Sequence, residues 1–266
     1  MILYLAGIGA HEKLHQYVLE NCPDIGVLCS FAEPKEFERL LNSDFKNIMV
    51  DSGAYGVSKR GLTINLDEYI YFLKENKDRI TVSVALDVIG NPEQSYKNWL
   101  YMREKGLDNV IPVYHLGEDI KWLDLYCKDI DFVGIGGIAG TVTNWKLYNS
   151  FLKRIVNKYP NHKFHVFGLN SYKALRAIDL YSCDATSWLV GMKYAELSSD
   201  NGRIRLRKED KNSEIWEQLE KWGILYSDFV ENKHDYLQLN KFNITYLYNL
   251  IKNHKMIDVS EQEELF

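Results

Sequence analysis

The sequence lacks any close pair of cysteines. Its four cysteines are Cys22, Cys29, Cys127 and Cys183, and none belongs to a Cys-x-x-Cys pair. Disulfide scaffolds and zinc ribbons need closer, patterned spacing, so both are excluded. A chain of 266 residues can also bury a large core without such staples. We therefore expect free thiols in a reducing cytoplasm.

Long apolar runs and an excess of positive charge are also missing. No stretch approaches the ~20 apolar residues that a membrane span needs. Residues 1–14 lack the basic region of a signal peptide. Lysine and arginine total 32 against 37 acidic residues, which gives a net charge of −5. This balance argues against a non-specific coat protein of nucleic acid but allows one local basic patch. We expect a cytoplasmic protein with no membrane partner.

Eight short apolar segments alternate with longer amphipathic ones. The short segments, rich in Val, Ile and aromatic residues, are 2–7, 25–30, 47–52, 80–87, 109–115, 131–137, 163–169 and 181–187. Nearly continuous apolarity is typical of strands that are buried on both faces of a parallel sheet. Segments with helical spacing lie between them at 66–77, 92–105 and 144–158.

Strands that alternate with helices form either a closed barrel or an open, doubly wound sheet. The number of strands favours the closed form, and the length is close to the ~250 residues of one such barrel. We therefore predict an α/β fold with a (β/α)8 TIM barrel over residues 1–190. Residues 191–266 are richer in charge, with helical stretches near 213–221 and 246–255. We expect them to form a C-terminal helical extension packed on the barrel, not an independent domain.

Acidic side chains, one imidazole and two glycine turns end the predicted strands. In chain order these residues are Asp51, Asp87, His115, Gly136, Gly137, Gly168, Asn170 and Asp184. The carboxyl ends of barrel strands carry the active site in this architecture. Each aspartate could instead cap the next helix or turn. Three acids on one rim, beside glycines that permit close ligand approach, favour a site.

Two carboxylates without a metal suit the chemistry of a glycosidic bond. One attacks the anomeric carbon and the other handles the proton of the leaving group, which gives a covalent intermediate and retention. The sequence has no Gly-x-Ser-x-Gly elbow and no cage of His and Cys. Segment 134–140, GIGGIAG, has glycines but not the Gly-x-Gly-x-x-Gly order of a dinucleotide site. We expect neither a metal nor another cofactor.

A series of motifs at these strand ends resembles a known family. DSGAYGV at 51–57 resembles the DSGG(F/Y)QV signature of the tRNA-guanine transglycosylase superfamily, and SVALD at 83–87 is similar to its strand-four acid. VYHLGE at 113–118 falls at its VQGG-like turn, and GIGGIAG at its GGLAVGE-like loop. FGLN at 167–170 resembles its MGVG-like turn, and CDATSW at 183–188 its DCVLPTR-like nucleophile segment. The resemblance covers roughly residues 45–190.

The resemblance implies two catalytic residues and one acid that reads the base. Asp184 matches the nucleophile that attacks C1′ of the target guanosine. Asp51 matches the residue that protonates the departing guanine and deprotonates the incoming base. Asp87 matches the acid that hydrogen-bonds the purine edge.

The resemblance also implies further contacts to the base. Their candidates are Ser52, Tyr55, His115, Gly136, Gly137, Gly168 and Asn170. Tyr55 matches an aromatic residue that stacks on the base, and Gly137 a backbone donor. His115 stands where the family has glutamine and would need its neutral form to read the base edge.

Departures from the family pattern favour DNA as the polymer. No cysteine follows Cys183, so the family's structural zinc site is missing, and so are its added RNA-binding domains. A short, zinc-free form is similar to the DNA-guanine transglycosylases of bacterial and phage 7-deazaguanine DNA modification. The resemblance implies a pentosyltransferase that replaces guanine in DNA with a free 7-deazaguanine base such as 7-cyano-7-deazaguanine (preQ0). It would act in the cytoplasm, or in the host cytoplasm if phage-encoded.

Three alternatives stay open. The polymer could be tRNA, or the chain could be a catalytically inactive barrel that binds nucleic acid. It could also be another barrel enzyme, such as a sugar or phosphate aldolase or isomerase. That last class would need a lysine or a metal at a strand end, and no predicted strand ends in lysine.

A basic stretch and a tryptophan follow the predicted nucleophile. The basic residues of GRIRLRK at 202–208 are Arg203, Arg205, Arg207 and Lys208. Their alternate spacing predicts one strand face that meets phosphates, although a solvated edge strand would have the same pattern. Trp188 could stack beside a flipped base or lie in the core, and Lys193 is a further candidate.

Overall fold

The structure is a computed structural model that describes residues 1–61, 63–137, 145–169, 178–199, 202–208, 214–231 and 236–253. Its main feature is a 9-stranded sheet. The strands are β1 (Ile2–Ala6), β2 (Gly26–Ser30), β3 (Ile48–Asp51), β4 (Val82–Val84), β5 (Val110–Ile111), β6 (Val113–His115), β7 (Phe132–Gly136), β8 (Lys163–Val166) and β9 (Ser182–Ala185). Each lies within one of the eight predicted apolar segments, so the strand prediction is confirmed.

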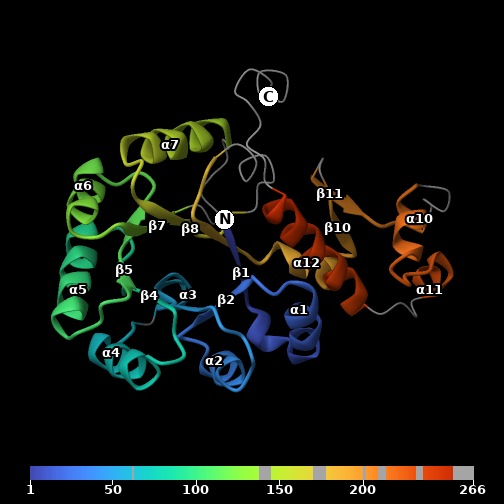
Figure 1. The fold of residues 1–266 in the computed structure, drawn as a ribbon, viewed down its shortest axis with the longest axis horizontal. Helices are drawn as coiled ribbons and strands as arrows, with labels where there is room; N and C mark the ends of the chain where they lie inside the picture. The colour runs from blue at the N-terminus through green and yellow to red at the C-terminus, as the bar shows by residue number, and fades with distance from the viewer. Residues whose placement is uncertain are drawn as a thin grey trace.

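The sheet is parallel and nearly closed on itself (Figure 1). Its order is β5-β4-β3-β2-β1-β9-β8-β7-β6, and all neighbouring strands run parallel. The two edge strands, β5 and β6, are separated only by Pro112, which has no N–H to continue the ladder. The carbonyl of Pro112 still accepts a hydrogen bond from Gly134 N at 2.9 Å. The chain therefore has a mixed α/β fold with a barrel-like sheet, which is compatible with the predicted TIM-type barrel.

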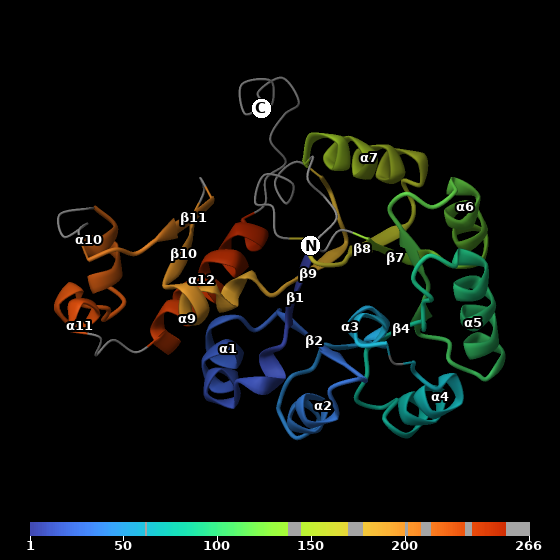
Figure 2. The same cartoon turned by 180° about the vertical axis from the view of Figure 1, so that it is seen from behind.

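The helices up to α7 lie around the outside of this sheet, except that α3 lies at one end of it (Figures 1 and 2). They are η1 (Ile8–Ala10), η2 (Glu12–Leu14), α1 (His15–Asn21), α2 (Pro34–Leu41), α3 (Ala54–Lys59), α4 (Leu66–Glu75), α5 (Pro92–Glu104), α6 (Ile120–Asp129) and α7 (Trp145–Lys158). The three helices predicted between strands correspond to α4, α5 and α7; residue 144 lies outside the described residues. Helix α5 begins as its sequence predicts, because Pro92 lies in its first turn and Asn91 Oδ1 accepts from Gln94 N at 3.1 Å. In the described part of the chain, every helix is too short or too polar to cross a membrane.

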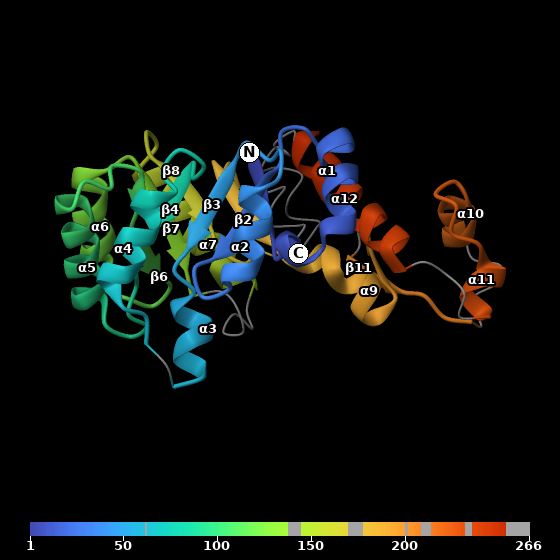
Figure 3. The ribbon, with the colours of Figure 1, turned by 90° about the horizontal axis from the view of Figure 1, so that it is seen from below.

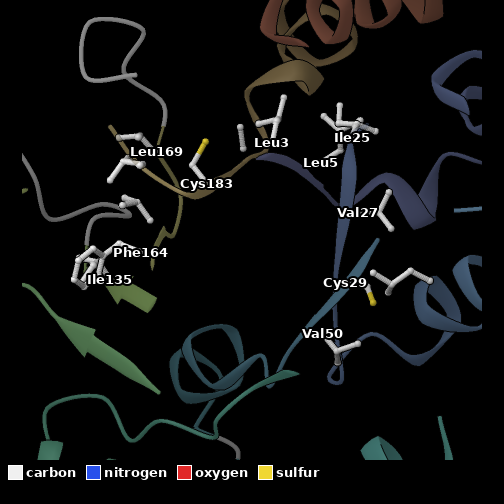
Figure 4. Close-up of a cluster of buried hydrophobic side chains, with 14 of the residues drawn as sticks. Leu3, Leu5, Ile25, Val27, Cys29, Val50, Ile135, Phe164, Leu169 and Cys183 are labelled. Atoms are coloured by element: carbon white, nitrogen blue, oxygen red, sulfur yellow. The ribbon is translucent and has the colours of Figure 1, made fainter. Parts of the chain in front are cut away.

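Apolar side chains fill both faces of the sheet. Alternate strand residues point inward, where Tyr4, Met49, Val84 and Val113 form one buried cluster. The intervening residues point outward and pack under the helices. Figure 4 shows part of this outer cluster, including residues of β1, β2, β3 and β9. All four cysteines are free thiols.

The chain after β9 continues through short elements and one long helix. These are η3 (Ser187–Leu189), α9 (Val190–Tyr194), β10 (Glu196–Ser199), β11 (Gly202–Arg205), α10 (Glu214–Glu220), α11 (Tyr226–Val230) and α12 (Tyr236–Lys252). Strands β10 and β11 pair antiparallel. The buried amide of Asn243 on α12 accepts from Ser198 N at 2.7 Å and donates to Glu196 O at 3.0 Å. Helix α12 begins ten residues before the predicted stretch at 246–255, and the division of the chain at residue 190 stays a prediction.

Gly26 on β2 gives a test of how side chains pack inside the barrel. A Cβ added at Gly26 would lie 2.5 Å from two ring atoms of Tyr4, whose ring is buried and whose hydroxyl donates to Asn47 Oδ1 at 2.8 Å. We expect Gly26→Ala to lower the free energy of unfolding by roughly 1–3 kcal/mol through overpacking. Urea denaturation measures this change.

The matched control is Gly56→Ala. A Cβ at Gly56 meets nothing within 4 Å, so this change should be neutral or stabilise α3 by about 0.5–1 kcal/mol. Equal stability of Gly26→Ala and the wild-type protein would show that the inward packing is wrong.

Candidate active site

Three of the predicted site residues face the inside of the barrel at the carboxyl ends of their strands. Asp51 comes two residues after the inward Met49 on β3, and His115 two residues after the inward Val113 on β6. Asp184 lies opposite the inward Tyr4 in the β1–β9 register. The structure therefore directs these side chains from distant parts of the chain toward one end of the barrel, as the sequence predicts.

Asp51 is the most perturbed acid of this group. Burial, the negative charge of Asp87 and the charge of Asp184 together raise its pKa from 3.8 to about 7. A hydrogen bond from Gly53 N to Asp51 Oδ2, at 3.2 Å, only partly opposes the shift. Asp87 and Asp184 therefore each lie close enough to Asp51 for their charges to act on its carboxyl group.

Asp87 is paired with His115 across the end of the barrel. His115 Nε2 lies 2.9 Å from Asp87 Oδ2, and its Nδ1 lies 3.3 Å from Glu118 Oε1. Burial lowers the pKa of His115, but the hydrogen bonds and charges of the two carboxylates outweigh it and raise this pKa to about 9. His115 is therefore an imidazolium at neutral pH. The predicted contact of His115 with a base edge needs the neutral form, which these two acids disfavour, and this role stays a prediction.

Asp184 is held by groups from the neighbouring strand. Gly168 N donates to Asp184 Oδ1 at 2.8 Å, and His165 Nε2 lies 3.4 Å from the same oxygen. Gly168 has a φ of 67°, a left-handed conformation that glycine adopts without strain and that turns its N–H toward the carboxylate. The predicted glycine turn after β8 thus supplies a donor to the predicted nucleophile.

Gly136 lets the ring of His115 approach the neighbouring strand. A Cβ at Gly136 would lie 2.8 Å from His115 Cδ2. Gly137 follows with a φ of 82°. These two glycines therefore have a structural reason in the packing of His115, beside their predicted contact with a ligand.

Ser52 and Tyr55 differ in how accessible they are. Ser52 is fully buried, and its Oγ accepts from Ala54 N at 3.2 Å at the start of α3. Tyr55 is 43% exposed on α3, with Lys59 Nζ 4.2 Å from its ring centre. Helix α3 projects from one end of the sheet (Figure 3). The ring of Tyr55 is thus partly exposed, and its stacking on a base stays a prediction. Asn170 lies outside the described residues.

A cavity of about 350 Å³ opens beside Asp87. Its walls come from α3, α4, the end of β4 and the start of α5, and they include Val57, Ile64, Leu86 and Ile89. The cavity is mainly apolar, with the Asp87 carboxylate as its acidic group. Its volume falls in the range of small-molecule sites.

The basic residues after β9 lie on an exposed ribbon. Arg205 pairs with Glu196 and Arg203 with Ser198 in the β10–β11 register, so both arginines lie on one face, as predicted. Each has a weak ion pair with Glu196, at 4.0 Å for Arg203 and 3.9 Å for Arg205. Arg207 and Lys208 follow as exposed residues, and Lys208 Nζ donates to Val230 O at 2.8 Å.

Trp188 lies in the core and not on a nucleic-acid surface. Its side chain is fully buried, its Nε1 donates to Ala6 O at 3.2 Å, and His11 packs edge-on against its ring. A ring without exposed surface has no face on which a base can stack, so we correct this prediction and remove Trp188 from the candidates. Lys193 is exposed on α9.

Two residues of the site were missed by the sequence analysis. Glu118 follows His115 by three positions, and His165 lies in the middle of a strand that was predicted as apolar. The signal for His165 was a single polar residue inside segment 163–169. Within the described residues, no group of three or more His, Cys, Asp and Glu side chains is arranged to hold a metal ion.

No family model matches the chain, and no curated protein matches it. The resemblance to guanine transglycosylases therefore rests on the motifs of the sequence, and the function stays a prediction.

The raised pKa of Asp51 predicts a pH-dependent stability. Between the unfolded pKa of 3.8 and the folded pKa of about 7, the native state binds a proton that the unfolded chain releases. Stability from this group is thus present below the unfolded value and lost as the pH rises through about 7. We expect Asp51→Asn to be more stable than the wild-type protein at pH 8, by roughly 2–4 kcal/mol, and to gain much less at pH 4. Urea denaturation at both pH values tests this, and a gain that does not vary with pH would contradict the coupling.

The ion pair of His115 predicts a loss of stability in the same direction, but at a higher pH. Its folded pKa of about 9 exceeds the unfolded 6.5, so its stabilisation is complete below the unfolded value and is lost as the pH rises through about 9. We expect His115→Gln to lower the free energy of unfolding by roughly 3 kcal/mol at pH 6 and by much less at pH 10. Urea denaturation at the two pH values measures the difference.

The exposed pair Lys97–Glu93, at 2.6 Å, provides the control. Lys97→Met should change stability by less than about 1 kcal/mol, because solvent screens a surface ion pair. A similar small loss in His115→Gln would mean that His115 is not held between two charged acids.

Proposed function

We propose that the chain is a (β/α)8-barrel enzyme that exchanges a guanine base in DNA for a 7-deazaguanine such as 7-cyano-7-deazaguanine. Asp184 is the nucleophile and Asp51 is the acid/base partner. The observation that carries the proposal is that Asp51 on β3 and Asp184 on β9 both face the inside of the barrel at its carboxyl end, with Asp87 close enough to help raise the pKa of Asp51. Acids from three strands that share one region suit glycosidic bond chemistry, which needs two carboxyl groups with different protonation states.

The first displacement breaks the bond between the sugar and guanine. The Asp184 carboxylate attacks C1′ of the target nucleotide, and a C1′–O bond forms as the C1′–N9 bond breaks. The electron pair of the broken bond goes to the base, which takes the proton of Asp51. A pKa of about 7 suits this step, because a substantial fraction of Asp51 is protonated near neutral pH.

The second displacement installs the new base. Asp51, now ionised, takes the N9 proton of the free 7-deazaguanine as N9 attacks C1′, and Asp184 leaves as a carboxylate. Two inversions at C1′ give overall retention. The reaction exchanges one base for another and needs no oxidant or further reactant.

Asp87 reads the base in this proposal. The ring of His115 lies 2.9 Å from its Oδ2, and a carboxylate accepts hydrogen bonds and cannot donate them. A carboxylate of this kind selects a base edge that has two neighbouring N–H donors, as guanine and 7-deazaguanine have. The cavity beside Asp87 adds apolar surface near this group, and Tyr55 on α3 is the residue proposed to stack on the base.

The polymer is reached through the rim of the barrel. A base in a duplex must leave the stack before its C1′ can be attacked. Arg203 and Arg205 share an exposed face, and Arg207 continues the basic stretch, so all three can meet phosphates. DNA is preferred because no cysteine follows Cys183 to form the zinc site of the tRNA-specific family.

Base exchange and a covalent adduct test the proposal together. Folded wild-type protein, DNA and labelled 7-cyano-7-deazaguanine should put label into the polymer, with parallel reactions on tRNA. Denaturing gels should show a protein–DNA adduct. We expect Asp184→Asn to remove both signals, and Asp51→Asn to lower exchange about 10²–10⁴-fold.

Asp108→Asn is the matched control, because Asp108 is an exposed aspartate that precedes β5 at the opposite end of the barrel. It should leave exchange unchanged. If folded wild-type protein puts no label into DNA or tRNA, the proposed function is refuted. If label enters only tRNA, the substrate is tRNA and not DNA.

A further inference from the structure

His165 is a fully buried histidine on β8, inside the barrel. Its ring packs against Phe167 and Tyr4, with centroid distances of 4.4 Å and 5.6 Å. A buried polar ring needs hydrogen-bond partners, because it has lost those that water would supply. The partners that the chain gives to His165 are both on β9.

The two ring nitrogens of His165 face different groups. Nδ1 lies 2.9 Å from Ser182 Oγ, and Nε2 lies 3.4 Å from Asp184 Oδ1. In the described part of the chain, Nε2 has no regular hydrogen bond, so the Asp184 carboxylate is the polar group it faces. Ser182 and Asp184 lie two residues apart on one strand, which places both under the same ring.

These contacts favour one tautomer. If the Ser182 hydroxyl donates to Nδ1, the proton of the ring lies on Nε2 and points toward the carboxylate oxygen. The other tautomer would direct the lone pair of Nε2 at that oxygen, which is repulsive in a dry interior. With this tautomer, Asp184 Oδ1 accepts the N–H of Gly168 at 2.8 Å and faces the Nε2–H of His165 at 3.4 Å.

We propose that His165 is the positioning residue of Asp184: together with Gly168 it fixes Oδ1 and leaves Oδ2 as the oxygen that attacks C1′. The inference rests on the proposed function for the identity of that step. In it the C1′–Oδ2 bond forms, the C1′–N9 bond breaks, and the base takes its electron pair and the proton of Asp51. Outer groups that orient a reacting side chain act on the rate, because small misplacements are costly.

Kinetics separate this role from a role in folding alone. We expect His165→Leu to lower kcat about 100-fold with KM changed by less than about threefold, because the nucleophile is misaligned while the base site is intact. His165→Gln keeps an N–H donor near the place of Nε2 and should stay within about tenfold of the wild-type kcat. An unchanged kcat in His165→Leu, or a loss confined to KM, would overturn the proposal.

His162→Gln is the matched control. His162 lies three residues earlier, on the outer side of the sheet, where its Nε2 contacts Cys127 O at 2.8 Å. It should leave kcat and KM unchanged. A loss in His162→Gln equal to that in His165→Leu would show a general packing effect and overturn the positioning role.

A spectroscopic readout keeps the inference independent of turnover. Long-range ¹H–¹⁵N spectra of the wild-type protein should show His165 protonated on Nε2 and not on Nδ1, with a ¹⁵Nε2 shift that changes in Asp184→Ala. Protonation on Nδ1, or a shift that ignores Asp184→Ala, would overturn it. If the wild-type protein exchanges no base, the proposed function fails, and these spectra still decide whether His165 holds Asp184. If His165→Leu does not fold, His165→Gln and the spectra decide.

Discussion

Repulsion between Asp51 and its two acidic neighbours is the constraint on which the site depends. A nearly closed parallel sheet brings the carboxyl ends of β3 and β9 and the turn after β4 to one end of the barrel, and each contributes an acid. Burial and the charges of Asp87 and Asp184 hold Asp51 partly protonated near neutral pH. This arrangement destabilises the fold above pH 7 and supplies the protonation state that acid/base chemistry requires.

Neighbouring groups offset the electrostatic repulsion between the acids, and they differ from one acid to the next. Asp87 has a cation, His115, which Glu118 holds from its other side. Asp184 receives the N–H of Gly168 and faces the ring of His165. Asp51 has backbone hydrogen bonds from Gly53 N, at 3.2 Å to its Oδ2, and from Ser52, which only partly offset burial and the neighbouring charges. Its pKa is therefore raised, and it is the acid that the proposed reaction uses to move a proton.

The sequence predicts the strands and the acids well, because both have local signals. Apolar runs of β-branched and aromatic residues locate every strand of the 9-stranded sheet but not the β10–β11 pair, and an aspartate at the end of such a run predicts the rim. The partners of the acids have no local signal. His115 and Asp87 are far apart in the sequence and meet only because the sheet is nearly closed. His165 is a single polar residue in a segment whose sequence predicts an apolar strand. Helix α12 begins earlier than predicted because its buried Asn240 and Asn243 interrupt the apolar stripe and instead hydrogen-bond Met192 N and Ser198 N. The sequence around Trp188 is compatible with a buried and with an exposed side chain, so the sequence alone does not decide between the two.

Site-specific titration of the Asp51 carboxyl tests the central claim most directly. Carboxyl ¹³C shifts of the wild-type protein should give a midpoint for Asp51 near its raised pKa of about 7. The same titration in Asp87→Asn and in Asp184→Asn should give lower midpoints, because each variant removes one of the two charges that oppose ionisation. A midpoint near the ordinary value of 3.8 in the wild-type protein, or one that neither variant changes, would contradict the account.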